Sequence, residues 1–327
     1  MKKFLLIITF CTVLSEMVFP QGACCGGMGT TGTRFGLGTA NAKSLQLQLA
    51  YDLNFMSALY DGDVRLEDDS RQRVVHSGIL EANYGINRRF SVAGMITYMV
   101  QEIGSTTLDG IRQVEYMWGF GDMVIMAKLR IINPLAHNGW GLYAGIGPKI
   151  PTGSYNQTRT DGSIFSMDLQ PGTGSFDAIS WLSLSKSHIF ITNLYLNSGA
   201  TFRLSGKNRN FRDSLTYISG NEFQYTAGLS YNFYRGIVFD IFSYVRYRYQ
   251  AMDKLSGEPV DVCGGHWLFI SPGIKLNFTQ NFSFIVFTDL PLYQNLRGPQ
   301  LTTSYRFSAG LIYNFESRRS TEIGLDQ

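Results

Sequence analysis

Hydrophobic and polar residues alternate with a period of two along much of this chain, which predicts β-strands whose two faces meet different surroundings. The pattern is clearest in residues 44–58, and residues 118–132 and 139–153 repeat it. In the first of these stretches, the apolar series is Leu45, Leu47, Leu49, Tyr51, Leu53 and Phe55. These stretches are longer than the five or six residues of an ordinary strand. Long strands with one apolar and one mixed polar face are typical of a membrane-spanning β-barrel.

The same pattern predicts twelve strands, separated by connections that are alternately long and short. The predicted strands cover residues 44–58, 74–86, 90–102, 118–132, 139–153, 176–185, 188–204, 221–233, 237–250, 265–278, 282–290 and 302–315. The long connections are 59–73, 103–116, 151–175, 205–220, 251–264 and 291–301. We therefore predict an all-β fold: an antiparallel transmembrane β-barrel of about 12 strands, with short periplasmic turns and long extracellular loops.

The N-terminus is typical of an exported protein. Lys2 and Lys3 precede a short apolar stretch and then a polar region that ends at Ala23, which predicts a secretory signal peptide. A lipoprotein signal with Cys24 as the modified residue remains the alternative. The predicted organisation is a signal peptide at 1–23, a Gly-rich segment at 24–43 that is a candidate plug, a barrel at 44–315 and a polar tail at 316–327.

Composition supports a membrane location and gives no indication of nucleic-acid binding. The formal net charge of the 327-residue chain is only +3. The 23 Phe and 18 Tyr are enough to form aromatic girdles at the two membrane interfaces. The girdle candidates near strand ends are Trp118, Trp140, Trp267, Tyr247 and Tyr249. We expect the protein in the bacterial outer membrane, with lipid and a small-molecule solute as partners; the oligomeric state stays open.

Many ionisable residues fall on the mixed polar face of the predicted strands. A Lys or Arg facing lipid near the middle of the membrane would cost about 2–4 kcal/mol, so the register that turns them inward is favoured. The candidates to line the lumen are Asp122, Lys128, Arg130, Lys149, Asp240, Arg246, Arg248, Lys275 and Arg306. Two interpretations remain open: a polar lumen that passes or binds a solute, and a narrow barrel filled by paired charges.

Three motifs occur in an order that is known from one family. They are GFGD at 119–122, GPKIPTG at 147–153 and LQPGTGSFD at 169–177. Over residues 118–235 the sequence resembles the outer-membrane transporters named after the phenol-degradation meta-pathway. The resemblance implies an outer-membrane channel for small, often hydrophobic or aromatic molecules. The alternatives are a closed structural or adhesive barrel without transport and, with less support, an outer-membrane enzyme.

The second and third motifs bracket the longest predicted loop. Their loop and gate candidates are Pro151, Thr152, Gly153, Gln170, Pro171, Gly172 and Asp177. Gly and Pro can fold the strand ends back, so the loop could enter the lumen and gate it. The simpler interpretation is that these residues only end the strands. Asp122 and Asp177 are the expected partners of Lys149 or Thr152.

The sequence offers weak metal candidates and no catalytic signature. Cys24, Cys25, Cys263 and His266 carry suitable ligand atoms, but their spacing is not CxxC. The expected topology also places Cys24 and Cys263 on opposite membrane faces. A disulfide, lipidation and no special role remain alternatives for the cysteines. The GxSxG, HExxH and P-loop patterns are all absent, so we expect neither an enzyme nor a cofactor.

Overall fold

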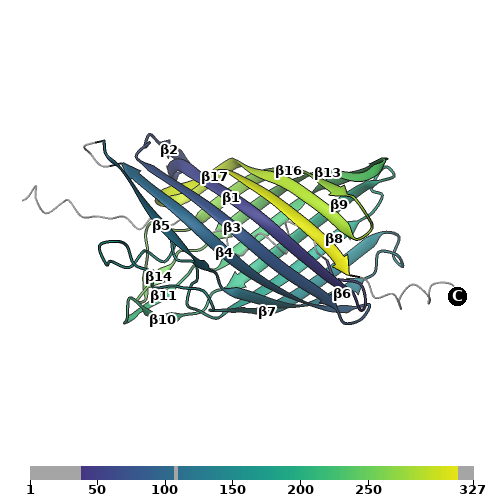
Figure 1. Cartoon of the computed structure of the whole chain (residues 1–327), viewed down its shortest axis with the longest axis horizontal. Helices are drawn as coiled ribbons and strands as arrows, with labels where there is room; N and C mark the ends of the chain where they lie inside the picture. The colour runs from purple at the N-terminus through teal and green to yellow at the C-terminus, as the bar shows by residue number, and fades with distance from the viewer. Residues whose placement is uncertain (1–37, 107–109, 316–327) are drawn as a thin grey trace, which may run out of the picture.

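The computed structural model describes residues 38–106 and 110–315, which form a closed antiparallel β-barrel (Figure 1). The strands of the ring are β1 (Leu45–Gly62), β3 (Arg71–Gly85), β4 (Phe90–Thr106), β6 (Met123–Ile132), β7 (Trp140–Ile150), β8 (Asp177–Lys186), β9 (Leu194–Leu204), β12 (Glu222–Arg235), β13 (Ile237–Gln250), β16 (Gly265–Asn277) and β17 (Phe282–Phe315). Each pairs with the next, and β17 also pairs with β1. The predicted all-β barrel is confirmed. In the described ranges, no helix is long and apolar enough to cross a membrane.

The last element, β17, contains two of the predicted strands. Its first part pairs with β16 and its second part with β1. The hydroxyl group of Thr288 donates a hydrogen bond of 2.9 Å to the carbonyl oxygen of Arg306, so the two parts lie side by side as a hairpin. Gly298 has a φ of 73° between them, a conformation that favours glycine. The predicted loop at 291–301 is therefore wrong, because extended backbone continues on both sides of this tight turn.

The remaining strands extend one end of the barrel. β2 (Val64–Leu66) and β5 (Arg112–Phe120) lengthen the wall there. A separate sheet contains β10 (Asn208–Phe211), β11 (Leu215–Ile218), β14 (Lys254–Leu255) and β15 (Glu258–Pro259). We call this end, on the left in Figure 1, the long-loop end, and the opposite end the short-turn end.

Three further boundaries differ from the prediction. The strand predicted at 118–132 is split into β5 and β6, which pair with successive parts of β4. The predicted loop at 103–116 is largely strand, because β4 and β5 continue as a paired ribbon beyond the ring. The strand predicted from residue 188 begins only at Leu194.

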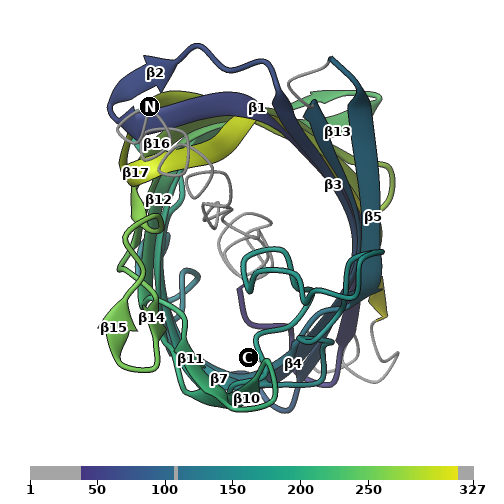
Figure 2. The same cartoon turned by 90° about the vertical axis from the view of Figure 1, so that its left-hand side faces the viewer.

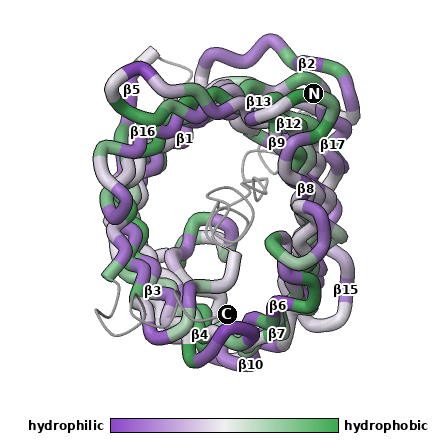
Figure 3. Tube along the Cα trace, turned by 90° about the vertical axis from the view of Figure 1, so that its right-hand side faces the viewer, coloured by the Kyte–Doolittle hydropathy of each residue, from purple (hydrophilic) through white to green (hydrophobic). Residues whose placement is uncertain are grey.

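Side chains alternate between the outer surface and the lumen, as the period of two requires. In β1, Leu49 is 57% exposed, whereas the neighbouring Ala50 is 3% exposed. Figure 3 shows the alternation of hydrophobic and hydrophilic positions along the wall, viewed from the short-turn end. Trp267 is a wrong girdle prediction. It pairs across strands with Arg248, whose side chain points inward, so its own side chain must share that face.

Candidate functional site

The structure places all nine predicted lumen-lining residues inside the barrel. The buried ones are Asp122, Lys128, Lys149, Arg246, Arg248 and Arg306. The half-buried ones are Arg130, Asp240 and Lys275. The two groups also differ in place, because the buried residues lie mostly in the middle and at the long-loop end, whereas the half-buried residues lie near the short turns.

A continuous chain of opposite charges crosses five neighbouring strands near the long-loop end. We call it the charge chain; in order, its members are Asp122, Lys149, Asp177, Arg203, Glu222 and Arg248. Successive nitrogen and oxygen atoms are 2.6, 3.3, 3.7, 3.4 and 3.1 Å apart. A buried charge is costly unless it is paired and hydrogen-bonded. Removing one member of the charge chain would therefore leave the buried charge beside it without a partner. Lys149 contacts both of its expected carboxylate partners, Asp122 and Asp177.

Three more buried ion pairs lie deeper in the lumen. Arg246 is 2.8 Å from Asp289, Arg306 is 2.6 Å from Asp52, and Lys128 is 3.4 Å from Glu81. These are distances between side-chain nitrogen and oxygen atoms. The interpretation of paired charges that fill the interior therefore describes this part of the barrel well.

Sequence reasoning missed two of the cations. Arg203 belongs to the charge chain, and Arg73 lies 3.6 Å from Asp168. Both occupy positions whose side chains point into the lumen. Arg73, for example, lies an even number of residues from Glu81 in β3 and so shares its face of the strand. Arg73 was overlooked because residues 59–73 were predicted to be a loop.

The two ends of the β7–β8 loop, residues 151–176, meet over Asp122. This carboxylate accepts hydrogen bonds from the backbone amides of Gly153 (3.1 Å) and Thr173 (2.9 Å). A Cβ atom on Gly172 would lie 2.6 Å from the carbonyl carbon of Gly153, so the crossing requires glycine. The second and third sequence motifs thus form one junction, with Lys149 beneath it.

The other motif residues support this junction. The Thr152 hydroxyl oxygen accepts a hydrogen bond of 2.9 Å from the backbone of Met123, and the half-buried Pro151 precedes it. Pro171 packs where a side chain on Gly119 would stand, with its Cγ 3.2 Å from the Cβ position. The GFGD motif therefore supplies a glycine that lets Pro171 pack closely, as well as the carboxylate of Asp122.

The middle of the loop folds into the lumen. Gln170 holds it in shape through hydrogen bonds of 3.0 Å with both backbone groups of Gln157. On the barrel wall, the Gln101 amide donates a hydrogen bond of 2.7 Å to the Leu169 carbonyl oxygen. Phe165 and Leu169 pack on Met117. Figure 2, viewed from the long-loop end, shows this teal loop projecting into the mouth. The loop therefore narrows the long-loop end.

An apolar belt lies inside the barrel, where the sequence predicted polar lining. Its members are Ala50, Ile79, Met95, Val124, Met126, Ile179, Trp181, Phe242, Ile285, Phe287 and Ile312, all buried. Tyr143 and Tyr244 pack against it. Interior positions in a barrel can thus be apolar although they face away from lipid, and a period-two pattern alone does not separate the two faces there.

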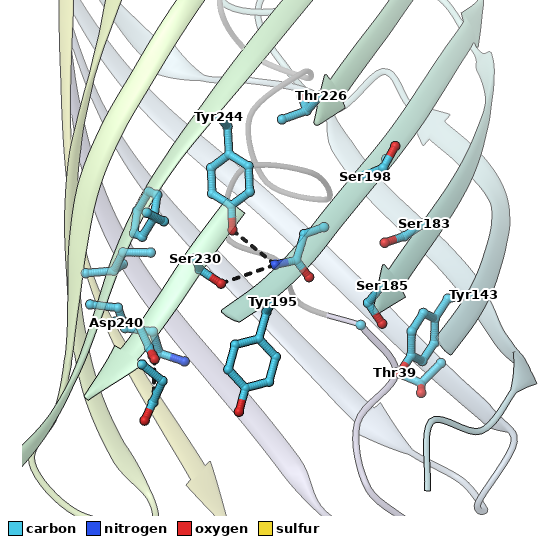
Figure 4. Close-up of a pocket in the computed structure, with 17 residues that line it drawn as sticks. Thr39, Tyr143, Ser183, Ser185, Tyr195, Ser198, Thr226, Ser230, Asp240 and Tyr244 are labelled. Carbon is cyan, nitrogen blue, oxygen red and sulfur yellow. Dashed lines mark hydrogen bonds between the residues drawn. The ribbon is translucent and has the colours of Figure 1, made fainter. Parts of the chain in front are cut away.

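A cavity of about 470 Å³ adjoins this belt at the short-turn end (Figure 4). Its wall combines hydroxyl groups with aromatic rings: among its residues are Ser183, Ser185, Tyr195, Thr226, Ser230 and Tyr244. Asn197 projects from β9 and donates hydrogen bonds of 3.4 Å to Ser230 and Tyr244. Among the described residues, the charged ones that line it are Asp240 and Lys275.

Part of the predicted plug segment borders the cavity. Gly38 and Thr39 line it, and Thr39 accepts a hydrogen bond of 3.0 Å from Arg130. Residues 1–37 and 316–327 lie outside the described residues, and with them the signal peptide, most of the plug segment and the polar tail.

The metal candidates are not brought together in the part of the chain that the structure describes. The Cys263 thiol is buried and accepts a hydrogen bond of 3.0 Å from the backbone of Asp253. His266 bonds instead with the Tyr247 hydroxyl group at 2.7 Å. Across the described ranges, no three His, Cys, Asp or Glu residues are grouped so that they could hold a metal ion. Cys24 and Cys25 lie outside these ranges.

Comparisons with known proteins agree with the architecture. The sequence profile of the family described as the MetA-pathway of phenol degradation matches residues 72–309. An outer membrane channel from Pseudomonas putida F1 has a similar structure, with 14% identity, a TM-score of 0.66, and coverage of 85% of this chain and 97% of that one. The transport unit of the autotransporter AIDA-I from Escherichia coli gives a TM-score of 0.49 at 11% identity, covering 84% and 91%. No curated protein matches the sequence.

Proposed function

Since this chain belongs to the MetA-pathway of phenol degradation family, we propose that it is an outer-membrane channel for small hydrophobic or aromatic molecules. The barrel is that of bacterial outer-membrane proteins, and its outer face is apolar. By the usual arrangement of such barrels, the short-turn end faces the periplasm and the long-loop end faces the exterior. The similar Pseudomonas protein is itself described as an outer membrane channel.

The observation that carries this proposal is the apolar belt beside a hydroxyl-lined cavity within a closed barrel. Ligand sites in proteins are mostly apolar, with a few polar groups that orient the ligand. A lumen built only of ion pairs would offer an apolar solute no favourable contact. The belt and the cavity together provide both kinds of contact along one interior.

Purified protein refolded into lipid vesicles and planar bilayers would test the proposal. We expect phenol influx, followed by vesicle swelling, to exceed that of vesicles with a denatured control. Shortening the loop by removing residues 156–168 should raise both influx and single-channel conductance. If the folded, heat-modifiable barrel gives neither influx nor conductance, even with the shortened loop, the channel proposal fails.

A closed structural or adhesive barrel is the second candidate. It is favoured by the charge chain and the inward loop, which fill much of the long-loop end. This candidate predicts that the shortened-loop variant stays impermeable, because ion pairs below the loop would still close the interior.

An enzymatic role has less support. In the described ranges, no histidine makes an ion pair with a carboxylate or a hydrogen bond with a serine hydroxyl group. His76 and His266 bond instead with tyrosines on the outer face. We therefore propose transport without a catalytic step.

A further inference from the structure

The cavity at the short-turn end contains a cation that makes no ion pair within the described part of the chain. The Lys275 side chain lines the cavity, and its cross-strand neighbour is Asp240. Among the described residues, the Lys275 ammonium makes no hydrogen bond and has no carboxylate oxygen within 4.0 Å. The two fully buried lysines of the described lumen, Lys128 and Lys149, are each in an ion pair.

Each oxygen of the nearby carboxylate already accepts a hydrogen bond from an asparagine amide. One oxygen of Asp240 accepts a hydrogen bond of 2.6 Å from the Asn232 amide, and the other accepts one of 2.9 Å from the Asn277 amide. These two bonds hold the carboxylate in place on the wall. The N–H groups of the Lys275 ammonium are consequently available to a ligand in the cavity.

A second cation, Arg130, contacts two residues that line the same cavity, Thr39 and Tyr143. The Arg130 guanidinium donates to the hydroxyl and carbonyl oxygens of Thr39, at 3.0 and 3.4 Å, and lies 6.0 Å from the centre of the Tyr143 ring. It has no carboxylate partner within 4.0 Å in the described part of the chain. In the described surroundings of the cavity, Lys275 and Arg130 thus supply two positive charges against the single negative charge of Asp240.

The remaining wall favours a flat, partly apolar ligand. Phe242 and Tyr244 lie 5.1 Å apart between ring centres, and Phe242 also belongs to the apolar belt. Hydroxyl groups of Ser183, Ser185 and Ser230 offer further donors. Charge-assisted hydrogen bonds are about twice as strong as neutral ones, so an anionic head group gains most from Lys275.

We propose that this cavity is a binding site for small organic carboxylates, with Lys275 holding the carboxylate and the aromatic residues holding the apolar body. The proposal rests on the channel function and adds charge selectivity to it. Solutes would be sorted at the short-turn end, after they have passed the loop and the ion pairs.

Binding to the full, refolded protein in detergent tests the site, with benzoate as the probe and benzyl alcohol as its neutral counterpart. We expect benzoate to bind at least tenfold more tightly than benzyl alcohol. Lys275→Gln should abolish that preference, and Lys275→Arg should retain it. Arg235→Gln, at the exposed last residue of β12, is the matched control and should behave like the unmodified protein.

Equal binding of the two probes, no binding of either, or a benzoate preference that survives Lys275→Gln would overturn the carboxylate site. Heat-modifiable migration of each variant shows that it has folded. Planar-bilayer conductance, recorded in parallel, separates the two proposals. A conducting barrel without benzoate preference refutes only the carboxylate site, whereas a barrel that binds benzoate but is impermeable refutes only the channel.

Discussion

At the long-loop end, Lys149 lies between two carboxylates, 2.6 Å from Asp122 and 3.3 Å from Asp177. At the short-turn end, Lys275 has no charged partner within 4.0 Å among the described residues. Both lysines sit on inward positions of long strands and look alike in the sequence. The difference comes from the packing around them: a loop covers the first, whereas the second borders a cavity. A paired charge of this kind stabilises the closed end, and an unpaired one is available to a ligand.

The largest expected effect is that of Lys149→Met. The change leaves two buried carboxylates without their shared cation, and breaking a buried ion pair typically costs about 3–5 kcal/mol. We expect a fall of that size in the free energy of unfolding, measured by denaturant titration in lipid vesicles. Lys254→Met, at an exposed position in β14, is the control and should change little. Equal losses in the two variants would show that the charge chain adds no stability.

Gly172→Ala should come next. The new methyl group would stand 2.6 Å from the Gly153 carbonyl carbon, and overpacking of this kind typically costs about 1–3 kcal/mol. Because the loop ends must separate to make room, conductance should rise as well. Gly94→Ala is the matched control, since no atom lies within 4 Å of its Cβ position. An unchanged conductance with a clear loss of stability would mean that the loop does not obstruct the lumen.

The separate sheet of β10, β11, β14 and β15 should respond to alkaline pH. Burial, and then the neighbouring Asp253 carboxylate, raises the pKa of Tyr217 well above its ordinary value of 10.0. Its hydroxyl group donates a hydrogen bond to Asp253. Because the folded pKa is the higher one, this stabilisation is complete below pH 10 and is lost as the pH rises further. The phenolate absorbance difference between the protein and Tyr217→Phe should show a transition well above pH 10. It should coincide with tryptic cleavage of the sheet; a midpoint near 10 would contradict the burial.

The smallest expected effect is that of Lys275→Gln on stability. Removing an unpaired, half-buried ammonium sacrifices no ion pair, so the free energy of unfolding should stay within about 1 kcal/mol of its original value. The same denaturant titration measures it. A loss as large as that of Lys149→Met would mean that Lys275 has a structural partner, and the contrast between the two ends would disappear.

The strands were largely predictable because the alternation of apolar and polar residues within each strand reflects lipid on one side and the lumen on the other. Gln48, Asp52 and Glu81 lie inside the barrel as their parity indicates. The errors lie where the strands run past the membrane: polar extended segments such as 103–106 and 112–116 lack the apolar face that identifies a lipid-facing strand. Gly298, followed by Pro299, gave a local sign that the chain makes a tight hairpin turn within residues 291–301.

The site was less predictable, because it depends on contacts between distant segments. The nine lumen-lining residues followed from their parity, but of their partners only Asp122 and Asp177, beside Lys149, were expected. The contacts of Gln101 with Leu169 and of Arg73 with Asp168 join residues far apart in the chain. The availability of Lys275 depends on two asparagine side chains, Asn232 of β12 and Asn277 of its own strand β16, which no spacing rule selects.

The closure of the ring by β1 and β17 also constrains the order of assembly. Leu45 pairs with Phe315, so the first strand finds one of its two neighbours only when nearly the whole chain is present. Until then the backbone donors and acceptors on that edge stay unpaired, and such an edge is a template for pairing with other chains. Contacts so distant in sequence also form slowly. The newly exported chain therefore depends on being kept apart from its copies until its last hairpin is in place.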